Sequence, residues 1–128
     1  MVLASHSHLV QRAEWSSDVP VAYSLGNFSM SASSTVVLKE VLPDFGVALH
    51  LYYDGKELQK ITFSLTKAVE KKGGKMVVWP VDALYDALKS QKEKARLMKE
   101  VKTVYRFFTT EELTDDPIRR EYPLVKKG

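Results

Sequence analysis

The sequence predicts an α+β domain, with a mostly antiparallel sheet of four or five strands and one long helix. Residues 46–79 contain three apolar runs separated by the turn dipeptides Asp54-Gly55 and Gly73-Gly74, a pattern typical of an antiparallel meander. Residues 82–108 then place apolar side chains at mostly helical spacing among Lys and Glu. The 128 residues are enough for one domain with a hydrophobic core.

The first strands are predicted by short apolar runs near the N-terminus. Met1-Val2-Leu3-Ala4 has the composition of a strand end, and Val19–Tyr23 predicts a second strand. Residues 29–34 are rich in Ser and predict a loop, and the β-branched run Thr35–Leu38 predicts a further strand. An incomplete sheet edge near residues 1–5 would invite pairing with another chain.

The meander is the clearest β-sheet signal. Gly46–Tyr53 is apolar and aromatic, and Met76–Trp79 is a short apolar run that ends at Pro80. Between them, Lys60–Thr66 alternates, with Ile61, Phe63 and Leu65 on one side and Thr62, Ser64 and Thr66 on the other. A period of two predicts a half-buried strand, with one face on the core and the other in solvent.

The helix is predicted to begin with Asp82 as its N-cap and to continue to near Tyr105. Its apolar stripe is interpreted as core packing and consists of Leu84, Leu88, Ala95, Met98, Val101, Val104 or Tyr105, and Phe108. Thr109-Thr110-Glu111-Glu112 matches a capping box and predicts a short last helix. We therefore expect a domain over 1–114, with strands and site loops over 1–80 and a helix over 82–108. A charged tail is expected over 115–128, with residues 118–128 mobile.

Composition excludes several classes of function. The chain has no Cys, which excludes disulfides, Cys-ligated zinc and a thiol nucleophile. Residues 1–64 carry 4 Lys/Arg against 6 Asp/Glu, and residues 65–128 carry 15 against 10. The basic half mixes both signs along the helix, so a solvated face is expected and nucleic acid is not an expected partner. Neither a signal peptide nor a membrane segment is predicted, so the chain as written is expected in the cytoplasm.

Two histidines stand two residues apart in Ser5-His6-Ser7-His8. In an extended backbone, residues i and i+2 point to the same side, so His6 and His8 are candidate metal ligands. The candidate carboxylate partners Glu14, Asp18 and Asp44 have no recognisable ligand spacing. The alternative is a pair of hydrogen-bonded loop histidines. The third histidine, His50, lies within a predicted strand and is expected on the solvent face or as a hydrogen-bonded core side chain.

The segment Tyr23-Ser24-Leu25-Gly26-Asn27-Phe28 follows a predicted strand. Gly26 permits positive φ or close approach of another backbone, and Asn27 tolerates a left-handed conformation. The segment is either a structural turn that closes the strand or a polar loop beside the metal. Neither Ser5 nor Ser24 has an evident base, which disfavours a serine nucleophile.

Together, Ala4-Ser5-His6-Ser7-His8-Leu9-Val10-Gln11, then Glu14, and then Val19–Phe28 resemble the C-terminal part of the CapA-type capsule and poly-γ-glutamate biosynthesis family. That family typically shows Gly-x-His-Pro-His-Val-x-Gln, an acidic residue and Tyr-Ser-Leu-Gly-Asn-Phe. The resemblance covers residues 2–80, is strongest over 4–28 and fades in the helix and tail. This chain departs from the pattern at Ala4, where the family has Gly, and at Ser7, where it has Pro.

The resemblance implies a calcineurin-like metallophosphoesterase fold, an α/β sandwich with a metal centre at the strand ends. His6 and His8 match the paired histidines of the family, and Ser5, Ser24, Gly26 and Asn27 would line the site. The metal would be divalent Mn, Zn or Fe, orienting a water or hydroxide. The earlier family motifs, which carry most of the ligands, have no counterpart in this sequence. The chain alone is therefore expected to hold an incomplete site and to be inactive.

Two hypotheses follow. In the first, the chain is a fragment or shortened relative of a CapA-type protein, and its histidine site is completed by the missing N-terminal region or by another subunit. In the second, it is a non-catalytic module for binding or assembly that takes a partner or a polymer, including a polyanionic one. The resemblance also implies that the full-length family is usually membrane-anchored and extracytoplasmic.

Overall fold

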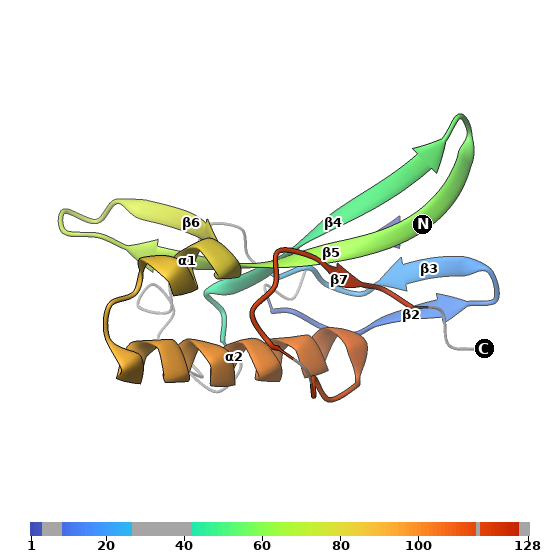
Figure 1. The fold of residues 1–128 in the computed structure, drawn as a ribbon. Coiled ribbons are helices and arrows are strands. Elements are labelled where there is room, and N and C mark those ends of the chain that lie inside the picture. Colours follow the sequence, from blue (N-terminus) through green and yellow to red (C-terminus); the bar gives the residue numbers. More distant parts are fainter. Residues whose placement is uncertain (4–8, 27–41, 115, 126–128) are drawn as a thin grey trace.

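The computed structural model has two sheets and two helices, which confirms the α+β class (Figure 1). It describes residues 1–3, 9–26, 42–114 and 116–125. In chain order the elements are β1 (Val2–Leu3), β2 (Ala13–Ser16), β3 (Val19–Ala22), β4 (Phe45–Asp54), β5 (Glu57–Glu70), β6 (Met76–Pro80), α1 (Val81–Ala87), α2 (Gln91–Thr109) and β7 (Tyr122–Pro123). The predicted strand at Thr35–Leu38 and the predicted loop at 29–34 lie outside the described residues.

The strands form two sheets rather than the one that we expected. One sheet has the order β1-β3-β2, and the other has the order β4-β5-β6 with β7 also paired to β5. The β4-β5-β6 meander is antiparallel, as predicted. The sheets meet where the amide of Val47 donates to the carbonyl of Leu25 at 2.7 Å and where Gly26 forms an isolated bridge with Gly46. This junction fixes the end of β3 against the start of β4.

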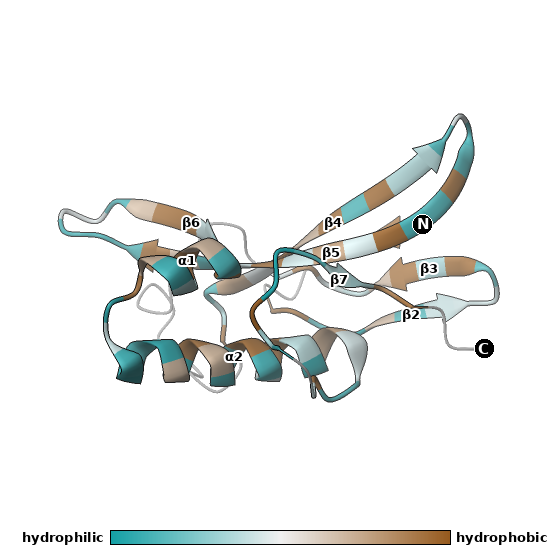
Figure 2. Ribbon diagram, viewed as in Figure 1, coloured by the Kyte–Doolittle hydropathy of each residue, from teal (hydrophilic) through white to brown (hydrophobic). Residues whose placement is uncertain are grey.

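Strand β5 is the centre of its sheet, and both of its faces are buried along its middle. Hydrophobic and hydrophilic residues alternate along the β4–β5 hairpin (Figure 2). The apolar side chains Phe63 and Leu65 are fully buried, but the intervening Ser64 is also only 8% exposed. The prediction of a half-buried strand is therefore wrong for this stretch. The alternation correctly separates the apolar face of the strand from the hydroxyl face. The hydroxyl face is nevertheless buried, because β7 and the segment before it pack against it. There the Ser64 hydroxyl donates to the carbonyl of Arg120.

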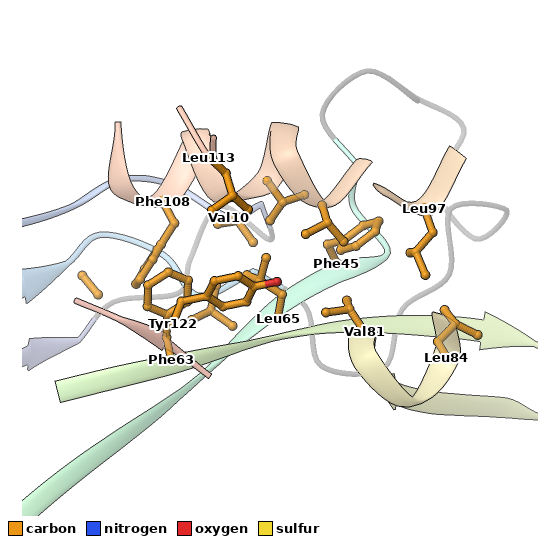
Figure 3. Packing of buried hydrophobic residues seen from close by; sticks show 14 residues of the cluster. Val10, Phe45, Phe63, Leu65, Val81, Leu84, Leu97, Phe108, Leu113 and Tyr122 are labelled. Carbon is orange, nitrogen blue, oxygen red and sulfur yellow. The ribbon is translucent and has the colours of Figure 1, made fainter. Parts of the chain in front are cut away.

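The hydrophobic core lies between the sheets and α2 (Figure 3). Phe63 is its centre, with ring centroids 4.8 Å from Phe108, 5.3 Å from Tyr122 and 5.9 Å from Tyr105. Helix α2 runs beneath the sheet in Figure 1, and its apolar side faces the strands. Aromatic rings in such contacts bury large apolar surfaces, so this cluster contributes strongly to the stability of the fold.

The single predicted helix is two helices separated by Leu88–Ser90. Leu88 is extended, with ψ 136°, and ends α1. The Ser90 hydroxyl accepts a hydrogen bond from the amide of Glu93 at 3.3 Å and caps α2. Ser90-Gln91-Lys92-Glu93 is thus a capping-box sequence inside the predicted helix. Because the Ser90 hydroxyl bonds to an amide group at the start of α2, beginning a new helix there competes with continuing α1. This competition explains the break.

The break also changes which residues face the core. The buried positions of α2 are Leu97, Val101, Val104 and Phe108, whereas Ala95, which we predicted on the stripe, is exposed. Leu84, Val101, Val104 and Phe108 of the predicted stripe are buried, as expected. The prediction fails in the first turns of α2, where Leu97 is buried and Ala95 is exposed. The predicted cap, Asp82, is also wrong: Pro80 occupies the N-cap position, and Asp82 accepts from Arg120 at 3.1 Å.

The predicted last helix at Thr109–Glu112 is wrong as well. Thr109 is the final residue of α2, and Thr110 closes the helix in a left-handed conformation with φ 63°. The hydroxyl of Thr109 accepts from the amide of Glu111 at 3.1 Å. The same side chain that would cap a new helix therefore forms a local turn, which is a common alternative for Thr.

The predicted tail packs onto the sheet, so the expectation of mobility is wrong for residues 118–125. Tyr122 is fully buried, and Phe63 pairs with it in the sheet. The Tyr122 hydroxyl donates to the carbonyl of Pro117, and burial raises the pKa of Tyr122 to about 12. Burial of the Tyr122 ring contributes to holding this segment against the sheet, together with the polar contacts of its neighbours.

Glu121 holds the same segment to the sheet through side-chain hydrogen bonds. The Tyr52 hydroxyl donates to this carboxylate at 2.8 Å, and the Thr62 hydroxyl donates at 2.9 Å. The hydrogen bond from Tyr52, followed by that from Thr62, lowers the pKa of Glu121. A carboxyl whose pKa is lower in the folded state stabilises the fold above its unfolded pKa, and this stabilisation is lost as the pH falls through the folded pKa.

We therefore expect Tyr52→Phe to lower the melting temperature at about pH 7, because the ionised Glu121 loses a donor. The difference from the unsubstituted chain should shrink as the pH falls to about 3 and Glu121 takes up a proton. Tyr53→Phe is the control, since Tyr53 is the next residue and is 58% exposed. Thermal unfolding followed by circular dichroism measures both, and a deficit in Tyr52→Phe that is equal at the two pH values would contradict the assignment.

Candidate functional site

The candidate site is the sheet edge where β1 and β3 end. These strands are parallel, with Val2 opposite Val21 and Leu3 opposite Ala22. Parallel strands bring their carboxyl ends to the same edge of a sheet, which is where open α/β sheets commonly place binding residues. Strand β1 leads into the sequence that contains His6 and His8, and β3 leads into Ser24–Gly26. Of the six predicted site residues, Ser5, His6, His8 and Asn27 lie outside the described residues.

Ser24 is fully buried and forms part of the turn after β3. Its hydroxyl accepts from the amide of Gly26 at 3.2 Å, and its carbonyl accepts from the amide of Gln11 at 3.0 Å. The side chain therefore bonds to the backbone two residues ahead, as Ser does in local turns. This geometry gives Ser24 a structural role in shaping the loop.

Gly26 occupies a position that admits only glycine. Its φ is +78°, a conformation in which a Cβ approaches the backbone too closely. A Cβ there would lie 2.7 Å from the carbonyl oxygen of Phe45 and 2.9 Å from a methyl group of Val10. The turn is therefore held closely against the start of β4, and both predicted properties of Gly26, positive φ and close backbone approach, are confirmed.

The three carboxylates suggested as metal partners lie in different surroundings. Glu14 on β2 accepts from the Tyr23 hydroxyl at 2.5 Å and lies 3.8 Å from Arg12; this hydrogen bond raises the pKa of Tyr23. Asp18 is exposed between β2 and β3, and Asp44 is buried before β4. Within the described ranges, no group of three His, Asp or Glu side chains is arranged to hold a metal ion.

Asp44 instead belongs to a partly buried charge cluster that we did not predict. The ammonium of Lys67 lies 2.9 Å from Glu100 and 3.6 Å from Asp44, and 5.1 Å from the centre of the Phe45 ring. The Asp44 side chain is only 9% exposed. The cluster joins β5, α2 and the segment before β4, close to the turn at Gly26. Two carboxylates share one ammonium, so each depends on Lys67 for compensation of its charge.

A sequence signal for this cluster existed. Lys67 interrupts the run Ile61–Val69, which otherwise contains only apolar and hydroxyl side chains, and a Lys that is partly buried in such a strand commonly pairs with an acidic group. The partners lie 23 and 33 residues away in the chain, so spacing alone could not identify them.

His50 is a hydrogen-bonded, partly buried histidine, in agreement with one of the two predictions for it. Its Nε2 lies 2.7 Å from the hydroxyl oxygen of Ser64. That hydroxyl donates its single proton to the carbonyl of Arg120, so the ring nitrogen is the donor in the first bond. Because the Ser64 proton is directed at a backbone carbonyl rather than at the imidazole, Ser64 is not arranged as a nucleophile activated by His50.

Comparison with models of known families, with curated proteins and with solved structures finds no match to this chain. Among the described residues, no helix has the length and apolar character needed to cross a membrane.

Proposed function

We propose that this chain is the C-terminal part, or a shortened relative, of a CapA-type protein of capsule or poly-γ-glutamate biosynthesis. In that role it contributes the histidine part of a metal-dependent, hydrolase-like site. The observation that carries the proposal is the parallel pairing of β1 with β3. Because of that pairing, the two strands that precede the two halves of the family-like motif end at one sheet edge. Such convergence supports a common role for the halves.

The turn at Gly26 gives a second line of support. The Tyr-Ser-Leu-Gly-Asn-Phe segment would need a residue without a side chain wherever its backbone packs against the next strand. Gly26 has that requirement, since its Cβ would meet the Phe45 carbonyl. Ser24 and Gly26 would then shape this loop, and Ser5 and Asn27 would line the site beside His6 and His8.

The proposed site is incomplete by its own chemistry. A catalytic metal takes about three protein ligands per ion, so two histidines need further ligands from another part of the protein or from another subunit. With those ligands, a Mn, Zn or Fe ion would orient a water or hydroxide and polarise a phosphoryl or acyl oxygen. The chain alone would bind metal weakly and would not turn over a phosphoester.

The second candidate is a non-catalytic module for binding or assembly. The observation that favours it is the exposed edge of the first sheet, where Val2 and Leu3 of β1 are each 53% exposed. A short apolar edge strand is suited to pairing with another polypeptide. The DNA upstream of Met1 separates the candidates: a continuous frame encoding Asp- and His-rich motifs supports the first, and an unrelated sequence supports the second.

The metal test uses the purified chain, loaded with Mn²⁺ or Zn²⁺ and analysed for metal after desalting. We expect well under one ion per chain, and a further loss in His6→Ala and in His8→Ala. His50→Ala is the matched control, since His50 bonds to Ser64, and it should retain the metal. Equal metal content in His6→Ala and the unsubstituted chain would contradict the role of the histidines. One tightly held ion per chain would contradict an incomplete site.

A further inference from the structure

A concave site lies beside β2, whose Ala13 pairs with Ala22 at the end of β3. It is a cavity of about 330 Å³ enclosed by β2, the C-terminal end of α2 and the segment that follows β7. Cavities of this size are at the lower end of those that hold small ligands. Figure 1 shows these three elements side by side at one end of the molecule, and the contacts between α2 and β2 agree with that arrangement.

The charges around the cavity favour a cation. Two carboxylates, Glu14 on β2 and Glu111 after α2, line it together with one guanidinium, Arg12. Thr109 and Thr110 also line it, so the C-terminal end of α2 faces the cavity. The carbonyl groups at a helix C-terminus carry about half a negative charge. The two carboxylates and the C-terminus of the helix together favour a cation over an anion in the cavity.

The remaining walls suit an aliphatic stem and a cationic head. Trp15, Tyr105 and Leu124 are also among the residues that line the cavity. Aromatic faces attract ammonium and guanidinium groups. The chain shows this chemistry at the rim, where the Arg12 guanidinium lies 5.2 Å from the centre of the Tyr23 ring and 3.8 Å from Glu14.

We propose that this cavity binds an ammonium or guanidinium group carried on a short apolar stem. Glu14 and Glu111 compensate the charge, and Trp15 and Tyr105 pack against the stem. Arg12 is an internal competitor, because its guanidinium already lies beside Glu14. Glu14 is also one of the candidate carboxylate partners of the proposed metal site, so the two proposals share this side chain. Amine binding is measured without metal, so either assignment can fail without the other.

The probes are pentylamine and pentanoate, which share a chain length and carry opposite charges. Binding is followed in ¹⁵N spectra through the two indole N–H resonances, since the chain has only Trp15 and Trp79. Trp79 lies on β6, away from the cavity, and is an internal reference; a Trp79→Phe variant assigns the two signals. We expect a saturable shift of the Trp15 resonance with pentylamine, at about millimolar affinity, and a smaller or no shift with pentanoate.

Two substitutions give effects of opposite sign. Glu111→Gln should weaken pentylamine binding about two- to fivefold, as expected for one partly solvated charge. Arg12→Gln should strengthen it, because Glu14 loses its competing cation. Glu112→Gln is the control: Glu112 pairs with Arg106 at 3.4 Å and does not line the cavity. Arg12, Glu111 and Glu112 are all exposed, so these variants should fold.

A further probe, an acetylated and amidated Ala-Lys-Ala peptide, distinguishes a lysine side chain of a polypeptide from a free small amine as the ligand. Tighter binding of the peptide than of pentylamine indicates a lysine side chain of a polypeptide, and the reverse order indicates a small amine. Three outcomes would overturn the proposal: pentanoate binding as tightly as pentylamine, weaker pentylamine binding in Arg12→Gln, or no saturable shift with any cationic probe.

Discussion

Gly26→Ala is expected to destabilise the fold by about 3 kcal/mol or more. A left-handed backbone costs a residue with a Cβ about 1–2 kcal/mol, and the new methyl group would also lie 2.7 Å from the Phe45 carbonyl oxygen. That oxygen belongs to the backbone of the central sheet and cannot move without disturbing the pairing of β4 with β5. Urea unfolding followed by circular dichroism measures the loss.

Gly74→Ala is the matched control for this prediction. Gly74 has φ +80°, nearly the same as Gly26, but a Cβ added to it would have no other atom within 4 Å. The variant should therefore show the backbone cost alone, about 1 kcal/mol. Equal losses in the two variants would mean that the turn at Gly26 is not packed against β4, and would remove a support for the proposed site.

Phe63→Ala is the second large effect, with an expected cost of about 3–5 kcal/mol. Phe63 is fully buried and contacts rings from both α2 and β7. Because Tyr122 stacks on Phe63 with ring centroids 5.3 Å apart, the C-terminal segment should loosen together with the core. Unfolding in urea measures the stability, and limited trypsin digestion reports cleavage at Arg119 and Arg120.

The control for Phe63→Ala is Tyr53→Ala in the hairpin of the same sheet. Tyr53 is 58% exposed, so its removal should change the free energy of unfolding by less than about 1 kcal/mol and leave the trypsin pattern unchanged. A Phe63→Ala protein of undiminished stability, or one whose tail resists trypsin as well as before, would contradict the packing of the tail on the core.

The two substitutions bear on the function in different ways. Gly26→Ala tests the geometry on which the CapA-type proposal depends, because it alters the turn that follows β3. Phe63→Ala tests the platform on which α2 and the C-terminal segment are held. That platform also forms two walls of the proposed cation cavity, so a loosened tail should weaken amine binding without a change to Glu14 or Glu111.

The candidate site was only partly predictable from the sequence. Glycine at position 26 could be recognised because a turn after a strand commonly needs positive φ, and the structure confirms that need. The Lys67 cluster could not be assembled, since its acidic partners Asp44 and Glu100 are brought to it by chain segments distant in sequence. The hydroxyl of Ser24 could not be assigned either, because its bond to the Gly26 amide depends on the turn conformation.

The sequence by itself determined the α+β class and the β4-β5-β6 meander, because a period of two and the glycine turns are local properties that tertiary packing did not override. Only the tertiary structure decided the rest. It placed the strands in two sheets that meet at the Gly26–Gly46 bridge. It also broke the helix at Ser90, which caps the start of α2. It also packed the charged tail, because Tyr122 gains the ring cluster around Phe63 only after distant strands and helices have assembled.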